Sequence, residues 1–261
     1  MSTLLESAGG YVDAGGLSTY YEAVGTGDPL VMLHGGFTTV ETLGGLTALF
    51  TDAYRVYSPE RRGQGRMPDI PGPITYEIMA EDTIAFIDAL GLGPVHVVGW
   101  SDGANVGLIT ALRRPDLVRK LVLIGTAEHV SGCTPIAQAM LPQLTAEQLP
   151  PMLVQAYAEL SPDGPEHLAV VVDKLAPALA VTSVRLPDLA RVAAPTLVMA
   201  ADDDMVSIAH LEAMRDALPD GQVAVVPGTS HGLPLEKPEL TARLIRDFLA
   251  DEQVTKLMPM R

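Results

Sequence analysis

The sequence predicts an α/β fold in which a mostly parallel sheet of eight strands is flanked by helices. Short, continuous apolar runs such as Leu30–Leu33 and Leu121–Ile124 are typical of strands that are buried on both faces. Helical patterns lie between successive runs, and this alternation implies right-handed crossovers and parallel strands. The chain has 261 residues, of which 48% are hydrophobic, so it is long enough to bury a large core.

Each strand of the predicted sheet is bounded by turn-forming residues. The first two strands should pair as a hairpin across Ala14-Gly15-Gly16, and a turn is expected at Pro227–Gly232 after the last strand. The predicted strands are Gly10–Asp13, Ser18–Val24, Leu30–Leu33, Tyr54–Tyr57, Pro94–Val98, Leu121–Ile124, Pro195–Ala201 and Gln222–Val226.

Four helices are predicted to flank this sheet. One begins at Tyr76 and ends at Gly91, one follows Ser101 and stops before Pro115, and one covers residues 207–218. The last begins at Pro238. Apolar positions at helical spacing should face the core, namely Ala80, Ile84, Ile87 and Leu90 in the first helix and Leu240, Leu244 and Phe248 in the last.

The segment from Glu128 to Pro187 differs in composition and hydrophobic pattern from the rest of the chain. It contains many prolines and short apolar helical pieces but no apolar strand pattern. We interpret residues 128–187 as a helical cap over the edge of the sheet, and residues 1–127 and 188–261 as the core. The alternative interpretation is a set of peripheral surface helices.

Charge and cysteine content exclude several classes of protein. The chain carries 17 Lys+Arg against 32 Asp+Glu, a formal net charge of -15, which repels nucleic acid and anionic membranes. A single cysteine, Cys133, rules out an intramolecular disulfide and favours a reducing compartment. No segment has the pattern of a signal peptide or a membrane span. We therefore expect a cytoplasmic protein, a monomer or homodimer, with no nucleic-acid or membrane partner.

The stretch Gly99-Trp100-Ser101-Asp102-Gly103 lies where an apolar strand meets a helix. Gly-x-Ser-x-Gly in that context is the layout of a nucleophile elbow, a sharp turn that presents the serine. A serine hydroxyl needs a base within hydrogen-bond reach, and the base needs an acid that orients it. Asp204 and His231 also follow predicted strands, so all three should emerge at the same edge of the sheet.

These motifs together resemble the α/β-hydrolase fold of serine hydrolases. The resemblance covers residues 10–127 and 188–252 and rests on His34-Gly35-Gly36, the elbow, the acid after Pro195–Ala201, and Ser230-His231-Gly232. The loop Arg62-Gly63-Gln64-Gly65 is similar to the family's Asp-x-Arg-Gly-x-Gly-x-Ser motif, although Glu60 and Met67 stand where Asp and Ser are usual.

The resemblance implies a role for each matching residue. Ser101 would be the nucleophile, His231 the general base and Asp204 the acid that holds the imidazole. The oxyanion hole would combine the backbone N–H of Asp102 with one from the loop after Leu33, with Gly36 the first choice and Phe37 the second. The resemblance implies no cofactor, and no two histidines have metal-ligand spacing.

Several nearby residues have competing interpretations. Asp202 and Asp203 compete with Asp204 as the acid, and Glu128 is a further alternative because it also follows a strand. His34 should shape the oxyanion loop and His96 should be a core residue, whereas His167 and His210 are expected on helix surfaces. Cys133 is interpreted as a buried or cap residue.

A serine nucleophile favours acyl transfer, and hydrolysis of a small carboxylic ester or lactone is the broadest hypothesis. Carbon–carbon bond hydrolysis or perhydrolysis could use the same triad, and a ligand-binding or signalling module with a vestigial triad is a third alternative. The expected substrate is a mostly apolar small molecule. Its expected pocket is lined by Trp100, His129, Met140, Leu144, Met152 and Leu153.

Overall fold

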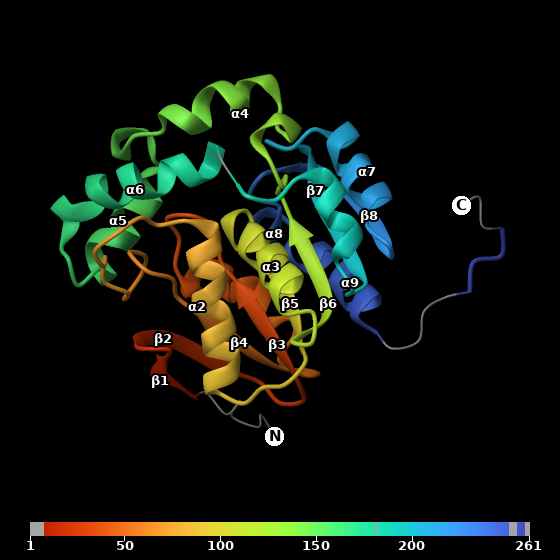
Figure 1. The fold of residues 1–261 in the computed structure, drawn as a ribbon, viewed down its shortest axis with the longest axis horizontal. Helices are drawn as coiled ribbons and strands as arrows, with labels where there is room; N and C mark the ends of the chain where they lie inside the picture. Colours follow the sequence, from red (N-terminus) through yellow and green to blue (C-terminus); the bar gives the residue numbers. More distant parts are fainter. Residues whose placement is uncertain (1–7, 181, 251–254, 259–261) are drawn as a thin grey trace.

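A computed structural model describes residues 8–180, 182–250 and 255–258 (Figure 1). Its eight strands form one sheet in the order β1-β2-β4-β3-β5-β6-β7-β8. The hairpin of β1 and β2 and the pairing of β2 with β4 are antiparallel, and all other pairs are parallel. The strands are β1 (Ala8–Ala14), β2 (Leu17–Val24), β3 (Asp28–Leu33), β4 (Tyr54–Pro59), β5 (Val95–Trp100), β6 (Val118–Ile124), β7 (Thr196–Asp203) and β8 (Gly221–Ser230). The mostly parallel eight-stranded sheet expected from the sequence is confirmed.

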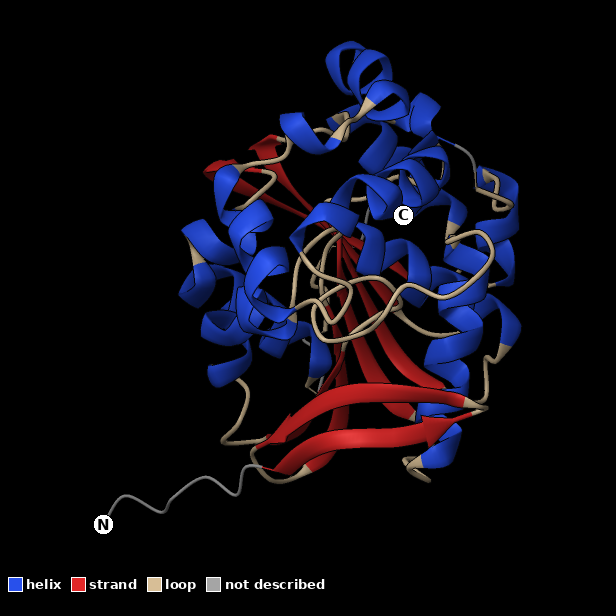
Figure 2. Cartoon of the chain, turned by 90° about the vertical axis from the view of Figure 1, so that its left-hand side faces the viewer, coloured by secondary structure: helices blue, strands red, loops and turns tan. Residues whose placement is uncertain are grey.

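Helices cover both faces of the sheet, as Figure 2 shows. The core-forming helices are α1 (Gly44–Ala48), α2 (Tyr76–Ala89), α3 (Asp102–Arg113), α7 (Ile208–Ala217), α8 (Leu233–Glu236) and α9 (Pro238–Leu249). One apolar cluster joins α2, α3 and α7 to the sheet, and a second joins α1, α8 and α9 to it. Neighbouring strand residues alternate between the clusters: Val31 and Leu33 belong to the first, and Leu30 and Met32 to the second.

The side on which successive strands are added to the sheet changes at β3. The chain passes from β3 to β4 on one side, and then crosses to β5 on the other side of β3. The loops after β3 and β5 therefore lie next to each other at the carboxyl edge, where a crevice forms in sheets of this kind. These two loops hold the predicted oxyanion residues and the predicted nucleophile.

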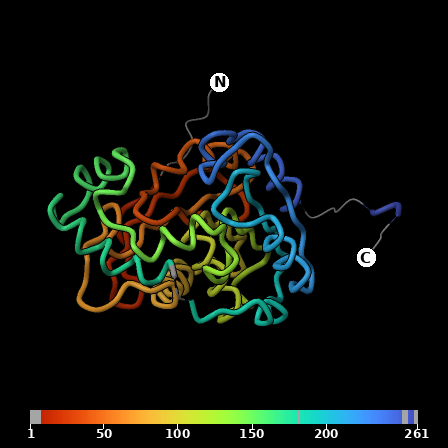
Figure 3. The backbone as a smooth tube through the Cα atoms, turned by 90° about the horizontal axis from the view of Figure 1, so that it is seen from above, coloured from red at the N-terminus to blue at the C-terminus, as the bar shows by residue number. Residues whose placement is uncertain are grey.

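The segment between β6 and β7 is built from short helices and contains no named strand in the part that the structure describes. In Figure 1 the three α-helices of this segment lie beyond the end of the sheet at which the strands point, and Figure 3 shows them spread over part of that end. Its elements are η2 (Val130–Gly132), α4 (Pro135–Met140), η3 (Leu141–Gln143), η4 (Ala146–Gln148), α5 (Pro151–Leu160), η5 (Pro165–His167), α6 (Leu168–Ala180) and η6 (Leu186–Arg191).

A buried carboxylate ties this segment to the core. Asp69, in the loop after β4, accepts hydrogen bonds from Lys174 Nζ at 2.7 and 2.8 Å and lies 2.9 Å from His167 Nε2. The Asp69 side chain is only 7% exposed, so its charge is stabilised mainly by these partners. His167 lies at the surface of η5, with its side chain 33% exposed, and it also takes part in this link, which the sequence did not indicate.

Two further expectations differ from the structure. Strand β8 continues to Ser230, so most of the turn expected at residues 227–232 is strand, and a register shift lies opposite it in β7. In α9, Leu240 is 38% exposed, whereas Ile245, Phe248 and Leu249 are buried. The helix is rotated toward Ile245, which packs in the same cluster as Phe50 and Leu233. No helix in the described residues is long and apolar enough to cross a membrane.

Candidate active site

Ser101 occupies a strained turn between β5 and α3. Its φ of 56° and ψ of -122° lie in a region that non-glycine residues rarely adopt. The turn is held because Ser101 N–H donates to the Ile124 carbonyl at 2.8 Å on β6. A Cβ at Gly99 would lie 2.3 Å from the Gly103 carbonyl oxygen, and one at Gly103 would lie 2.3 Å from the Leu33 oxygen. Both glycines are therefore required by close backbone approach, which accounts for the motif.

The side chains of Ser101, His231 and Asp204 form a hydrogen-bonded chain. His231 Nε2 lies 3.0 Å from Ser101 Oγ, and His231 Nδ1 lies 2.8 Å from Asp204 Oδ1. Ser101 follows β5, Asp204 follows β7 and His231 follows β8, as the sequence predicts. The Trp100 indole donates to the His231 carbonyl at 2.9 Å, so the loop that carries the histidine is fixed to the residue before the serine.

Asp204 is held as a carboxylate by its surroundings. Its side chain is fully buried, and burial alone would raise its pKa, but the hydrogen bond and charge of His231 and the backbone N–H groups of Ala201 and Met205 lower the pKa below its usual range. The two N–H groups donate at 3.0 and 2.7 Å. An ionised Asp204 can orient the imidazole and stabilise its protonated form.

The competing acids are not hydrogen-bonded to His231 in the described part of the chain. Asp202 accepts a hydrogen bond from Thr229 N–H at 3.2 Å, and Asp203 is exposed. Glu128 Oε2 lies 2.6 Å from His210 Nε2, and both side chains are largely enclosed. The expectation that His210 lies on a helix surface is therefore wrong. No hydrogen bond joins Glu128 or Asp203 to His231 in the described part of the chain.

The loop after β3, residues 34–38, is fixed by a buried cation. Arg61 donates from Nη1 to the His34 carbonyl at 2.5 Å and from Nη2 to the Gly35 carbonyl at 2.8 Å. Burial and the Arg61 charge hold the His34 pKa well below its usual range, so the ring is neutral, and its Nδ1 lies 2.8 Å from the Gly35 oxygen. Thr38 Oγ1 donates to the same oxygen at 2.8 Å. His34 thus shapes the loop, as expected.

Asp102 lies beneath this loop. Its Oδ1 accepts a hydrogen bond from Tyr76 OH at 2.7 Å, and its Oδ2 is buried without a hydrogen-bond partner in the described residues. Burial raises the Asp102 pKa, although the charge of Arg61 acts in the opposite direction. A Cβ at Gly36 would lie 2.3 Å from Oδ2, so the absence of a side chain at residue 36 lets the loop pack against this carboxylate.

A small cavity of about 50 Å³ opens at Ser101 and His231. One part of its wall is polar, and the rest is apolar and includes side chains from the β6–β7 segment. The lining residues are Tyr76, Ser101, Asp102, Asn105, Gly125, Thr126, Ala127, Val130, Cys133, Leu141, Leu179, Thr182, Met205, Val206 and His231. The cavity is thus bordered by both the core and that segment.

None of the six residues predicted to line the pocket is in this lining. Trp100 is buried behind the histidine loop, and His129 turns back to Ser131, 2.8 Å from its hydroxyl. Met152 is 64% exposed, and Leu144 and Leu153 pack against the core cluster. Local periodicity identified the apolar residues of this segment but not the direction in which each one points.

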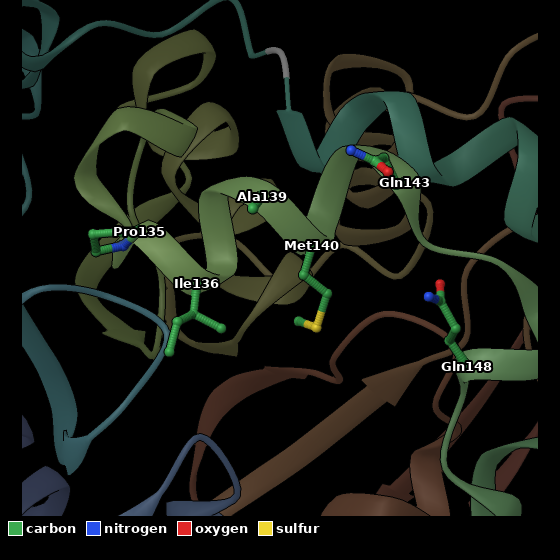
Figure 4. Close-up of a pocket in the computed structure, with 6 residues that line it drawn as sticks. All are labelled: Pro135, Ile136, Ala139, Met140, Gln143 and Gln148. Carbon is green, nitrogen blue, oxygen red and sulfur yellow. The ribbon is translucent and has the colours of Figure 1, made fainter.

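Met140 borders a different hollow from the one at Ser101. It lines a shallow surface hollow of about 590 Å³ together with Pro135, Ile136, Ala139, Gln143 and Gln148 (Figure 4). None of these residues borders the cavity at Ser101. The neighbouring Leu141 does border it, so a single helical step separates the expected residue from the one that faces the catalytic side chains.

Cys133 borders the cavity, a position that the sequence did not indicate. Burial and the nearby charges of Asp204 and Glu128 raise the pKa of its thiol to about 11, so it is a poor nucleophile at neutral pH. Tyr76 and Asn105 were also missed, because each is an ordinary helical residue in sequence. Within the described residues, no cluster of His, Cys, Asp or Glu has the arrangement of a metal site.

Comparisons with known proteins identify relatives of this chain among hydrolases. Residues 30–244 match the model of the alpha/beta hydrolase family. The RutD protein of Caulobacter sp. (strain K31), provisionally named a carbamate hydrolase, is 28% identical over 219 residues, which cover 76% of this chain and 82% of the relative. The 2-hydroxy-6-oxo-6-(2'-aminophenyl)hexa-2,4-dienoic acid hydrolase of Metapseudomonas resinovorans is 26% identical over 266 residues, 92% of this chain and 90% of the relative.

The fold also matches solved structures. A thermophilic esterase from Thermogutta terrifontis has a TM-score of 0.73 and 26% identity, with 94% of this chain and 98% of that one covered. The serine hydrolase CarC, involved in carbazole degradation, has a TM-score of 0.77 and 24% identity, with 93% and 98% covered. The family match covers most of the chain, and the sheet, elbow and strand order agree with it. The chain therefore belongs to the alpha/beta hydrolase family and is a hydrolase of that fold.

Proposed function

We propose that this protein is a serine hydrolase that cleaves a small carboxylic ester or lactone through an acyl-enzyme. The observation that carries the proposal is the chain of side chains from Asp204 through His231 to Ser101, with separations of 2.8 and 3.0 Å. These distances are those at which a base can take the serine proton as the oxygen attacks a carbonyl.

In the proposed mechanism Ser101 Oγ attacks the ester carbonyl while His231 Nε2 accepts the proton. His231 then delivers that proton to the leaving alcohol, and the acyl group remains on Ser101. Water, activated by the same imidazole, releases the acid and restores the serine. The tetrahedral oxyanion of each half-reaction would be met by the backbone N–H groups of Asp102 and Gly36, each worth ~3 kcal/mol.

The size and charge of the cavity support a small, uncharged acyl group. Its volume of about 50 Å³ leaves little space beside the serine, and no Lys or Arg is among its lining residues. The formal net charge of -15 repels anionic substrates. A neutral ester or lactone fits these conditions better than a carboxylate such as the dienoic acid that names one relative.

Residues 128–187 would act as a cap over the site. Leu141, Leu179 and Thr182 come from this segment and border the cavity. The link from Lys174 and His167 to Asp69 supports the proposal, because it holds the segment against the core. Leu141 and Leu179 would then select the acyl chain, while Val130, Cys133 and Thr182 of the same segment would complete its side of the cavity.

The test combines covalent labelling with a substrate panel. A fluorophosphonate should label the protein at Ser101, as located by peptide mapping, and the label should be absent from Ser101→Ala. Esters and lactones with acyl chains of increasing length should be hydrolysed best at the short end of the series, and Ser101→Ala should lose roughly 10⁴-fold or more of kcat/KM.

Several results would overturn the proposal. Labelling at another residue, or full activity in Ser101→Ala, would contradict the mechanism. Faster turnover of ring-cleavage dienoates than of any ester would favour carbon–carbon hydrolysis with the same side chains, and peracid formation would favour perhydrolysis. Tight ligand binding without turnover would favour a binding module.

A further inference from the structure

Two backbone N–H groups of the loop after β3 compete for the role of second oxyanion donor. They belong to Gly36 and Phe37, and sequence alone leaves the choice between them open. The surroundings of the two peptide groups differ. The Gly35 carbonyl, in the same peptide as the Gly36 N–H, accepts two hydrogen bonds. The Phe37 N–H already donates a hydrogen bond of its own.

The Gly35–Gly36 peptide is oriented through its carbonyl. Arg61 Nη2 and Thr38 Oγ1 both donate to the Gly35 oxygen at 2.8 Å. The N–H and C=O of a trans peptide point in opposite directions, so the Gly36 N–H is directed away from these donors. In the described part of the chain this N–H has no hydrogen-bond acceptor.

The next peptide, Gly36–Phe37, is fixed through its N–H group by a side chain. The Phe37 N–H donates to Gln64 Oε1 at 2.8 Å, and Gln64 is 1% exposed. Phe37 has a φ of 58°, an uncommon conformation for a residue with a side chain, and this hydrogen bond helps to maintain it. An oxyanion could use the Phe37 N–H only if that bond broke and left a buried amide oxygen unsatisfied.

We propose that Arg61 and Gln64 are positioning residues of the oxyanion hole, which Gly36 and Asp102 form with their N–H groups. Arg61 aims the Gly36 N–H and polarises it, and Gln64 keeps the Phe37 N–H out of the site. This inference rests on the proposed function and adds to it the two side chains that set the donor geometry.

The charge of Arg61 acts along the peptide group. A cation at the carbonyl oxygen draws electron density toward that oxygen and increases the positive charge on the amide hydrogen of the same peptide. Burial lowers the Arg61 pKa to about 10, and the neighbouring Asp102 opposes this shift, so Arg61 is charged at neutral pH. The guanidinium also offsets the negative charge that Asp102 brings close to the developing oxyanion.

The decisive measurement is made on the wild-type protein. An aryl trifluoromethyl ketone forms a hemiketal when Ser101 Oγ bonds to its carbonyl carbon, the serine proton moves to His231 and the carbonyl oxygen becomes an oxyanion. We expect the amide proton resonances of Gly36 and Asp102 to move downfield on adduct formation, while that of Phe37 stays nearly unchanged. The chain has 4 phenylalanines, so selective ¹⁵N labelling and a Phe37→Tyr variant identify the Phe37 signal.

Variants test the two positioning residues. Gln64→Met removes the acceptor and should weaken the hemiketal and lower kcat by about 10²-fold, with little change in the KM of the best ester. Gln64→Glu restores the acceptor oxygen, so the Phe37 amide should again stay unshifted, but its carboxylate adds negative charge near the oxyanion and should recover only part of the lost kcat. Arg61→Lys keeps a charge but loses the fork that reaches two carbonyls, so it should show a smaller loss of the same kind.

Arg62→Met is the matched control. Arg62 is the next residue in the same loop, but it points to α2 and donates to Asp82 at 2.6 and 2.7 Å. It should lose thermal stability without weakening the hemiketal. A hemiketal that is weakened equally by Gln64→Met and Arg62→Met would overturn the inference, as would a large shift of the Phe37 amide. Failure of wild-type Ser101 to form the adduct with any ketone would instead contradict the proposed function.

Discussion

Glu128 and His210 form an enclosed pair, with Nε2 of the imidazole 2.6 Å from Oε2 of the carboxylate. Glu128 follows β6, one of the positions from which an acid could reach the histidine of a triad, but its carboxylate is committed to another imidazole. The Glu128 carbonyl also accepts a hydrogen bond from Thr182 Oγ1, which lies near the far end of the β6–β7 segment. The pair therefore anchors this segment, and Asp204 remains as the partner of His231.

The first prediction separates these two carboxylates. Asp204→Asn should lower kcat by roughly 10⁴-fold, because the amide favours the wrong imidazole tautomer. Glu128→Gln should keep kcat near the wild-type value and lose about 1–3 kcal/mol of unfolding free energy, because a charged hydrogen bond in a buried setting is weakened. Steady-state kinetics and urea denaturation measure the two effects. A collapse of kcat in Glu128→Gln with an intact fold would identify Glu128 as the working acid.

The second prediction concerns the neighbouring aspartates. Asp203→Asn should have kcat and stability close to wild type, because the Asp203 side chain is exposed at the end of β7. The change is chemically identical to Asp204→Asn, one residue away, so it is the matched control for that variant. If Asp203→Asn were the more damaging of the two, the geometry of the triad described above would be wrong.

The third prediction uses the buried carboxylate of Asp102. Its pKa in the folded state is raised above the ordinary value of 3.8 by burial, so the native protein binds this proton more tightly than the unfolded chain. Stability from this group is therefore greatest below about pH 4 and declines as pH rises through the folded-state pKa. Asp102→Asn, which keeps an oxygen for Tyr76 OH, should raise the melting temperature at pH 7–8.

The pH dependence is the decisive part of this experiment. The advantage of Asp102→Asn over wild type should shrink when both are melted at progressively lower pH toward 4, because wild-type Asp102 then becomes neutral as well. Differential scanning calorimetry across this range measures the difference. An advantage that grew toward acid pH would mean that the ionised carboxylate stabilises the native state.

The fourth prediction concerns the link between the β6–β7 segment and the core. Lys174→Met keeps the aliphatic stem but removes the ammonium group that donates hydrogen bonds to Asp69. About 1.5–3 kcal/mol of unfolding free energy should therefore be lost. A loosened cap should also raise KM more than it lowers kcat. Asp173→Asn, at the next position of α6 and exposed, should change neither quantity. Equal values of KM in Lys174→Met and wild type would show that this link does not support the site.

The sequence predicts the parts of the site that depend on backbone geometry. Gly99 and Gly103 are readable because the elbow permits no side chain there, and continuous apolar runs mark the strands at whose ends Ser101 and His231 lie. Contacts between residues that are far apart in the sequence produce no pattern in the local sequence. His167 and Asp69 are 98 positions apart, His210 and Glu128 are 82 apart, and neither pairing follows from helical periodicity.

Rotation of short helices accounts for the errors in the pocket. Met140 and Leu141 are both apolar and adjacent, but successive helical positions differ by about 100° in direction. Only tertiary packing decides which of them meets the cavity. The same argument applies to α9, where Leu240 fits the helical pattern but is largely exposed and Ile245 is buried.

The order of strands in the sheet has a consequence for how the protein refolds. Ser101 and His231 are 130 residues apart, and β5 reaches β8 only through β6 and β7. Parallel strands with such distant partners form late, because loop closure must precede their contacts. An intermediate that contains the elbow but lacks β8 would have the nucleophile without its base. The return of activity during refolding should therefore report the docking of the last strand rather than the initial collapse of the chain.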